Sequence, residues 1–372
     1  MNVGNAGLVI RERMRRALPT DDRLGVTDAE LAVLILCNLV TTVGLAGDIA
    51  RHLKNPDQLS NDFVSGWHLV LYGGVLAVGA WLGIGAIRRG PAYLHAAGTA
   101  TIGFLLLSFG GFCDAAWHHA FGTEAAVEAL VSPPHLVVFT GLVFLLTSPL
   151  VVLWKRPARR LGVVASIAAL ASVVSAVLVT SLFTGFLSPL AGGLSLQAGY
   201  TEPLLGESLQ DYDQVRGLGI AVWTVAVIVA AFTVLWVRFR LPPGMTFVGF
   251  VLIGLPAFVV TGDAISWNAP IRPLVVGFAV AGLVAEVLIG LLGRPTLGRI
   301  GASVTGAAVG AMLWAATFAG LQQQDRLVWN QSLWGGTVTL SALVGAAVAA
   351  LVALPAPTGA AVVDSVLGPR PA

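Results

Sequence analysis

The chain has 372 residues, of which 56% are hydrophobic and only 11% are charged. Soluble domains carry about a quarter charged residues, so this composition excludes an ordinary soluble protein. The formal net charge is +2, and the basic residues are spread over short segments between apolar runs. We therefore expect a protein whose surroundings are a lipid bilayer, with no nucleic-acid partner.

Apolar runs recur along the whole chain, and each is long enough to cross about 30 Å of hydrocarbon as a helix. They predict an all-α fold: a polytopic membrane helical bundle of ten transmembrane helices, arranged as five hairpins with partial internal repeats. The predicted spans are 31–50, 64–87, 97–117, 134–154, 161–184, 215–237, 245–263, 271–292, 299–320 and 332–354.

The basic residues predict how these spans are oriented. Sixteen of the 21 Lys and Arg residues fall in the N-terminal segment, in every second connection or in the C-terminal segment. Because cytoplasmic loops are enriched in Lys and Arg, both termini are expected in the cytoplasm, with the chain in the plasma (cytoplasmic) membrane. The side with fewer cations carries Arg51, Lys54, Arg216, Arg272 and Arg326.

Four regions follow from this pattern. Residues 1–30 form a cytoplasmic segment, and residues 31–154 hold two hairpins that resemble one another. Residues 155–354 form a six-helix scaffold, substrate or partner region, and residues 355–372 form a cytoplasmic tail. An assembly with copies of itself or with other subunits is compatible with this organisation.

The first two hairpins carry the same arrangement of acid and imidazole groups. In each, an aspartate and a histidine four residues apart lie on one helical face, and a second histidine follows on the next helix. The two copies are Asp48, His52 and His68, and Asp114, His118 and His135. Ionisable groups at membrane depth cost roughly 2.5 to 3.5 kcal/mol each, so their recurrence favours function over chance packing. The pattern predicts metal ligands at the outer face.

The similarity of the two hairpins extends beyond these ligands. Gly47-Asp48 aligns with Cys113-Asp114, and residues 67–74 align with residues 134–141. A fainter third copy in the fourth hairpin keeps an acid, Asp263, but no histidine. We interpret this pattern as an internal duplication.

Three further polar residues lie in or near the predicted spans. Asp263 is expected near the outer end of its span, where it would support the site as a second-sphere carboxylate. His119 neighbours His118 on a different helical face and is a second candidate for this supporting role. Glu286 lies nearer the inner end of its span and is expected to pair with Arg294 or Arg299.

Imidazole and carboxylate donors suit copper, zinc or iron, and the sequence has no set of thiolates for a softer site. An Asp-His-His triad leaves coordination positions open for water or substrate. The two triads can form two mononuclear sites or share one binuclear centre, and the sequence leaves both arrangements open.

The Asp-x-x-x-His…His pattern resembles the copper-binding pattern in the C subunit of particulate methane and ammonia monooxygenases. The second histidine follows sixteen residues after His52 and seventeen after His118. The resemblance implies copper, favoured here over zinc or iron, and oxidation of a small apolar molecule within a larger complex. It covers the ligand positions alone.

Three functions remain open from the sequence. The first is an outward-facing metal-dependent oxidoreductase or a subunit of one, and the second is a cation or proton transporter that uses the same residues. The third is a structural or assembly protein in which the Asp and His side chains only tie helices together. The inner halves of the early spans are almost wholly apolar, which disfavours a transport path.

Overall fold

The structure is a computed structural model of the chain. It describes residues 25–54, 66–122, 131–156, 160–190, 210–260, 271–292 and 297–354. Every regular element within these ranges is helical, apart from an isolated β-bridge between Arg160 and Arg240. The chain is an all-α, multi-pass membrane protein, as predicted.

Nine of the described helices are long and apolar enough to cross a membrane. These nine are α2 (Asp28–Lys54), α3 (Gly66–Arg89), α5 (Gly98–Phe121), α7 (Pro133–Lys155), α8 (Val163–Phe183), α10 (Gln210–Arg238), α13 (Arg272–Leu292), α14 (Arg299–Gln323) and α15 (Gln331–Val352). Three shorter helices are α4 (Ala92–Ala96), α11 (Met245–Gly254) and α12 (Pro256–Val260). A short 3₁₀ turn, Gly185–Leu187, follows α8.

The predicted span 245–263 is a broken helix in the structure. Helix α11 ends at Gly254, and α12 begins at Pro256. Proline has no backbone N–H and disturbs the preceding helical turn, which explains a break at this position. The apolar run was therefore recognised correctly, but its helix is shorter than the other nine.

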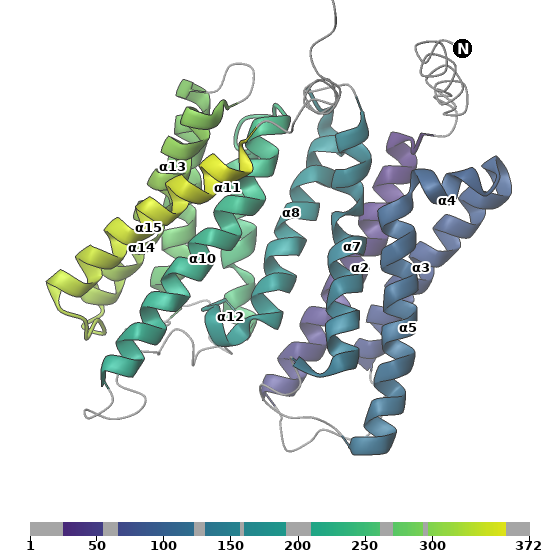
Figure 1. The fold of residues 1–372 in the computed structure, drawn as a ribbon, viewed down its shortest axis with the longest axis horizontal. Coiled ribbons are helices and arrows are strands. Elements are labelled where there is room, and N and C mark those ends of the chain that lie inside the picture. Colours follow the sequence, from purple (N-terminus) through teal and green to yellow (C-terminus); the bar gives the residue numbers. More distant parts are fainter. Residues whose placement is uncertain are drawn as a thin grey trace, which may run out of the picture.

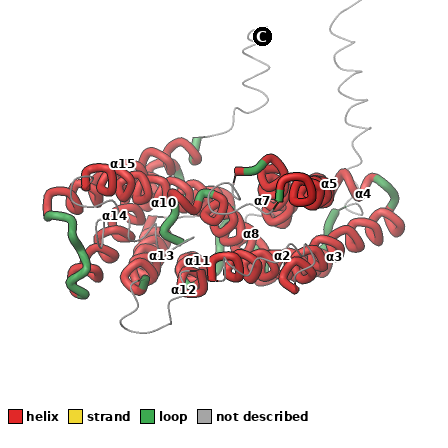
Figure 2. The backbone as a smooth tube through the Cα atoms, turned by 90° about the horizontal axis from the view of Figure 1, so that it is seen from below, coloured by secondary structure: helices red, strands yellow, loops and turns green. Residues whose placement is uncertain are grey.

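The helices run up and down in alternation, with α8 between two groups (Figure 1). One group holds α2, α3, α4, α5 and α7, and the other holds α10 to α15. Seen at right angles, α5, α7, α10 and α15 lie along one side, and α2, α3, α11 and α13 lie along the other (Figure 2). The first two predicted hairpins are present as the packed pairs α2–α3 and α5–α7, and the fourth and fifth as α11–α13 and α14–α15.

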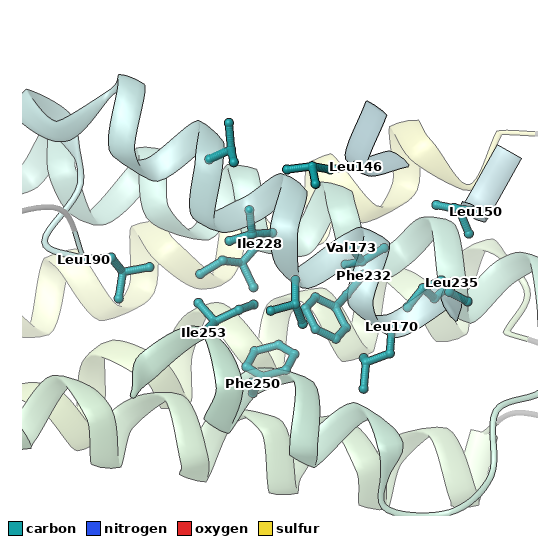
Figure 3. Close-up of a cluster of buried hydrophobic side chains, with 14 of the residues drawn as sticks. Leu146, Leu150, Leu170, Val173, Leu190, Ile228, Phe232, Leu235, Phe250 and Ile253 are labelled. Atoms are coloured by element: carbon teal, nitrogen blue, oxygen red, sulfur yellow. The ribbon is translucent and has the colours of Figure 1, made fainter. Parts of the chain in front are cut away.

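A buried apolar core joins the two groups where α7, α8, α10 and α11 meet. Phe232 and Phe250 are fully buried there, with ring centroids 4.6 Å apart. The surrounding side chains include Leu146, Leu150, Leu170, Val173, Ile228, Leu235 and Ile253 (Figure 3). This core ties the six later helices to the first two hairpins.

Basic residues at or just after the C-terminal ends of α3, α7 and α10 lie at one end of the bundle, here called the arginine end. Arg89 at the end of α3 pairs with Glu30 at 2.6 Å, and Arg156 after α7 pairs with Asp28. Arg238 at the end of α10 donates to the carbonyl of Arg156 at 2.8 Å. The start of α2 is thus bound directly to the ends of α3 and α7, and the end of α10 joins them through Arg156. The opposite end of the bundle is called the ligand end below.

The first two hairpins repeat the same close helix crossing. A Cβ placed on Gly44 of α2 would lie 2.6 Å from the Leu71 Cα on α3. At the equivalent positions, a Cβ on Gly110 of α5 would lie 3.0 Å from the Val138 backbone nitrogen on α7. Real Cβ atoms essentially never approach to 2.6 Å, and 3.0 Å is tighter than nine in ten real Cβ contacts, so glycine is required at Gly44 and favoured at Gly110.

A second pair of glycines repeats on the partner helices. A Cβ on Gly74 of α3 would lie 2.6 Å from the Thr41 backbone nitrogen, and a Cβ on Gly141 of α7 would lie 2.8 Å from the Leu107 backbone nitrogen. Thr41 and Leu107 also occupy equivalent positions. Small residues let helix backbones approach closely in membranes. The duplication in the sequence therefore corresponds to a duplicated packing unit.

Glu286 is bound to backbone groups and not to Arg299, while Arg294, its other predicted partner, lies outside the described residues. Its carboxylate on α13 accepts hydrogen bonds from the backbone N–H groups of Gly244 at 2.8 Å, Thr246 at 3.1 Å and Phe247 at 3.4 Å. The first N–H groups of a helix have no partner within it, and a carboxylate at that end also complements the helix dipole. Glu286 therefore caps the start of α11.

Replacing Glu286 with alanine should lower stability by about 2 kcal/mol, because hydrogen bonds to a charged acceptor are lost and helix N–H groups are left unsatisfied. Glu286→Gln keeps one carbonyl acceptor and should lose less. The measurement is the thermal unfolding midpoint of the detergent-purified protein. Equal midpoints for the wild type and the alanine variant would contradict the capping role.

Candidate metal centre

The ligand end of the second hairpin is built by the end of α5 and the start of α7. Helix α5 ends before Gly122, which has φ +84°, a conformation that side-chain-bearing residues rarely adopt. Ser132 is extended and precedes Pro133 and Pro134, which occupy the first positions of α7, where a missing N–H costs nothing. Local sequence thus fixes where both helices meet, close to Asp114, His118 and His135.

Asp114, His118 and His135 form one group in which the ligand atoms all lie within 4.8 Å of one another. The Asp114 Oδ1 atom is 3.4 Å from His118 Nε2 and 3.1 Å from His135 Nε2. Neighbouring ligands of a tetrahedral metal at about 2.0 to 2.2 Å are themselves about 3.3 Å apart. The spacing of these three residues therefore fits the edges of a coordination polyhedron.

The other ring nitrogens of both histidines are held by hydrogen bonds. His118 Nδ1 lies 3.1 Å from the Gly122 carbonyl oxygen, and His135 Nδ1 lies 3.0 Å from the Ser132 hydroxyl. A carbonyl oxygen can only accept, so His118 must carry a proton on Nδ1. In the neutral imidazole, Nε2 is then a bare acceptor that faces the carboxylate.

Two acceptors facing each other across 3.4 Å repel unless a cation lies between them. Three species satisfy this geometry: a second proton on His118, which makes an ion pair, a proton on the carboxyl group, which then donates to His118 Nε2, or a metal ion bound by both groups. Asp114 Oδ1 is buried and accepts no hydrogen bond of regular geometry within the described part of the chain. This geometry favours the metal, whose ligands normally have their second nitrogen held in this way.

The burial of the group increases from the histidines to the aspartate. The His118 and His135 side chains are 25% and 23% exposed, whereas the Asp114 side chain is 8% exposed. A buried carboxylate without a compensating cation is costly. The group is therefore open to a small ligand on its histidine side and closed on its aspartate side.

The first hairpin repeats part of this arrangement. His68 Nε2 on α3 lies 3.2 Å from Asp48 Oδ2 on α2, as His135 Nε2 on α7 lies 3.1 Å from Asp114 on α5. Equivalent residues of the two copies thus make the same kind of contact, between a histidine Nε2 atom and a carboxylate oxygen. The pairs lie near the end of α2 and the start of α3, and near the end of α5 and the start of α7. These helix ends are all at the lower end of the bundle in Figure 1.

The remaining predicted site residues have different outcomes. His52 lies in α2, four residues after Asp48, but its side chain is outside the described residues, as is all of Asp263. The His119 side chain is exposed, and His119 is not a member of the three-residue group. Its supporting role, like that of Asp263, stays a prediction.

Sequence reasoning missed three residues that shape the site: Ser132, Gly122 and Tyr72. Ser132 and Gly122 hold the Nδ1 atoms, and a Ser-Pro-Pro start and a His-x-x-x-Gly end were visible in the sequence as helix boundaries. Tyr72 lies one turn after His68, with the two ring centroids 5.9 Å apart. No local pattern in the sequence marks Tyr72.

Replacing Ser132 with alanine should weaken metal binding by the second hairpin about tenfold or more, because loss of a partner on a ligand's other nitrogen typically costs that much. Thr140→Ala removes a hydroxyl that bonds only to a backbone carbonyl on the same helix, and it serves as the control. Calorimetric titration of both variants with zinc measures the change. Equal affinities would show that Ser132 does not position His135.

Comparison with known proteins adds no relative: no protein-family model matches the chain, and no significant match is found among curated proteins or solved structures.

Proposed function

We propose that this integral membrane protein binds a transition metal at Asp114, His118 and His135, and acts as an oxidoreductase or as the metal-bearing subunit of one. The observation that carries the proposal is the convergence of His118 Nε2 and His135 Nε2 on the buried Asp114 Oδ1, at 3.4 and 3.1 Å, while both Nδ1 atoms are held by hydrogen bonds. A metal ion bound by all three groups would satisfy this arrangement. Three protein ligands leave further positions for water or substrate, as catalytic sites require.

A second site of the same kind is proposed at Asp48, His52 and His68. It is supported by the Asp48–His68 contact, which repeats that of Asp114 and His135. Copper is the favoured metal, and zinc and iron suit the same donors. The copper preference rests on the resemblance to the C subunit of the methane and ammonia monooxygenases.

The proposed orientation places the ligand end on the outer face of the plasma membrane. The basic residues at the other end are fastened to the start of α2, and such residues are enriched on the cytoplasmic side. Many large apolar side chains on α3, α5 and α13 are exposed, as expected for surfaces against lipid or partner subunits.

The test of the redox proposal is copper loading followed by redox titration. Purified protein is supplemented with copper, and the paramagnetic Cu(II) signal is followed as the potential is lowered and raised. We expect a reversible signal with nitrogen coupling from imidazole, reduced to about half in His118→Ala if the two sites are equivalent. Copper that binds but does not change oxidation state would contradict the oxidoreductase assignment.

Transport is the second candidate, favoured by the broken helix α11–α12. Discontinuous helices line substrate sites in many transporters, and α12 packs against α2, the helix that carries Asp48. Proteoliposomes loaded with a metal-sensitive dye distinguish the two functions. Metal entry that depends on His118 would support transport, whereas bound metal without entry would support the enzyme.

A further inference from the structure

One residue of the first hairpin contacts one residue of the second, and at both positions the equivalent residue of the other hairpin is different. Tyr72 on α3 stands where the second hairpin has Phe139, and Gly111 on α5 stands where the first hairpin has Leu45. A Cβ on Gly111 would lie 3.1 Å from the Tyr72 hydroxyl oxygen. The missing side chain in one hairpin thus makes room for the added hydroxyl of the other.

This contact lies between the two Asp-His pairs. Tyr72 is four residues after His68, on the same face of α3, and their rings are in contact. Gly111 is three residues before Asp114, on the same face of α5. His68 in turn contacts Asp48, with its Nε2 atom 3.2 Å from Oδ2, so Tyr72 lies beside both pairs. Phe139 instead packs on Phe183 of α8, with centroids 4.5 Å apart.

We propose that Tyr72 couples the two metal sites by sharing its single hydroxyl proton, as a hydrogen-bond donor, between the carboxylates of Asp48 and Asp114. A hydroxyl donates to one acceptor at a time. A metal on one carboxylate turns the hydroxyl toward the other, where the hydrogen bond competes with metal for the oxygen. Filling one site therefore weakens the other. This inference rests on the proposed metal-binding function and assigns Tyr72 a positioning role.

The test is a double-mutant cycle on zinc affinity at the second hairpin, measured by calorimetry with the full chain in detergent. Asp48→Asn removes the competing carboxylate, gives the hydroxyl to Asp114 and should weaken zinc binding there about fivefold, the lower range of typical coupling between sites. In Tyr72→Phe, the same Asp48→Asn change should weaken zinc binding less than about twofold. Folding alone would not produce this difference between backgrounds.

Two more variants test whether the coupling depends on the position of the Tyr72 hydroxyl. Gly111→Ala should also abolish the coupling, because it displaces the Tyr72 hydroxyl, whereas Phe139→Leu at the equivalent aromatic position should preserve it. Equal effects of Asp48→Asn in the wild type and in Tyr72→Phe would overturn the inference, as would no effect in the wild type. Two independent zinc sites would leave the metal-binding function standing. A wild type that binds no zinc would remove both.

Discussion

Replacing Asp114 with alanine is expected to remove one bound metal ion per chain and to lower affinity at the second hairpin by more than about 100-fold. This exceeds the 10- to 100-fold typical for losing a partner of a ligand, because Asp114 is itself a proposed ligand. Its Oδ1 atom faces both imidazoles, and Asp114 supplies the one carboxylate among the three described residues of the group. The measurement is metal content per chain after supplementation and removal of free metal.

His119→Ala is the matched control for Asp114→Ala. The His119 side chain is exposed on the same helix and belongs to no described ligand group. This variant should retain the metal content and affinity of the wild type. Loss of metal from His119→Ala, or full retention in Asp114→Ala, would show that the ligands have been assigned wrongly.

Replacing Gly44 with alanine is expected to destabilise the first hairpin by about 1 to 3 kcal/mol, the usual cost of forcing extra atoms into a packed interface. The added methyl group would meet the backbone of Leu71, which cannot move without separating α2 from α3. Because Asp48 lies one turn beyond Gly44, the same separation should weaken metal binding at Asp48 and His68.

Gly73→Ala provides a control with the opposite expected sign. A Cβ on Gly73 would meet nothing within 4 Å, and alanine favours a helix over glycine by about 1 kcal/mol. This variant should be as stable as the wild type or more stable. Thermal unfolding of the two variants side by side checks the pair, and a destabilised Gly73→Ala with an unchanged Gly44→Ala would contradict the crossing geometry.

Much of the fold was predictable from the sequence because the bilayer fixes helix length. Runs of apolar residues located the spans, and the four-residue separation of Asp114 and His118 placed both on one face of α5. The repeated motif also predicted that His135 would return to this face from the next helix. The structure brings these three residues together.

The rest depended on contacts between helices, which helical periodicity does not encode. The sequence does not reveal that Ser132 and Gly122 hold the histidine rings, because both residues first read as boundary signals. The sequence shows that Glu286 is acidic, but it does not show that the carboxylate accepts hydrogen bonds from the backbone N–H groups at the start of α11. The match between Tyr72 and Gly111 becomes visible only when the two hairpins are compared in three dimensions.

The most direct measurement of the central claim is X-ray absorption at the metal edge of copper-supplemented protein purified without chelator. The account predicts bound copper with nitrogen and oxygen ligands at about 2.0 to 2.2 Å and an imidazole scattering pattern. The double variant His118→Ala and His135→Ala should lose the copper of the second hairpin and keep that of the first. Protein that stays metal-free after supplementation would contradict it, and would show that only protons hold Asp114 and its histidines together.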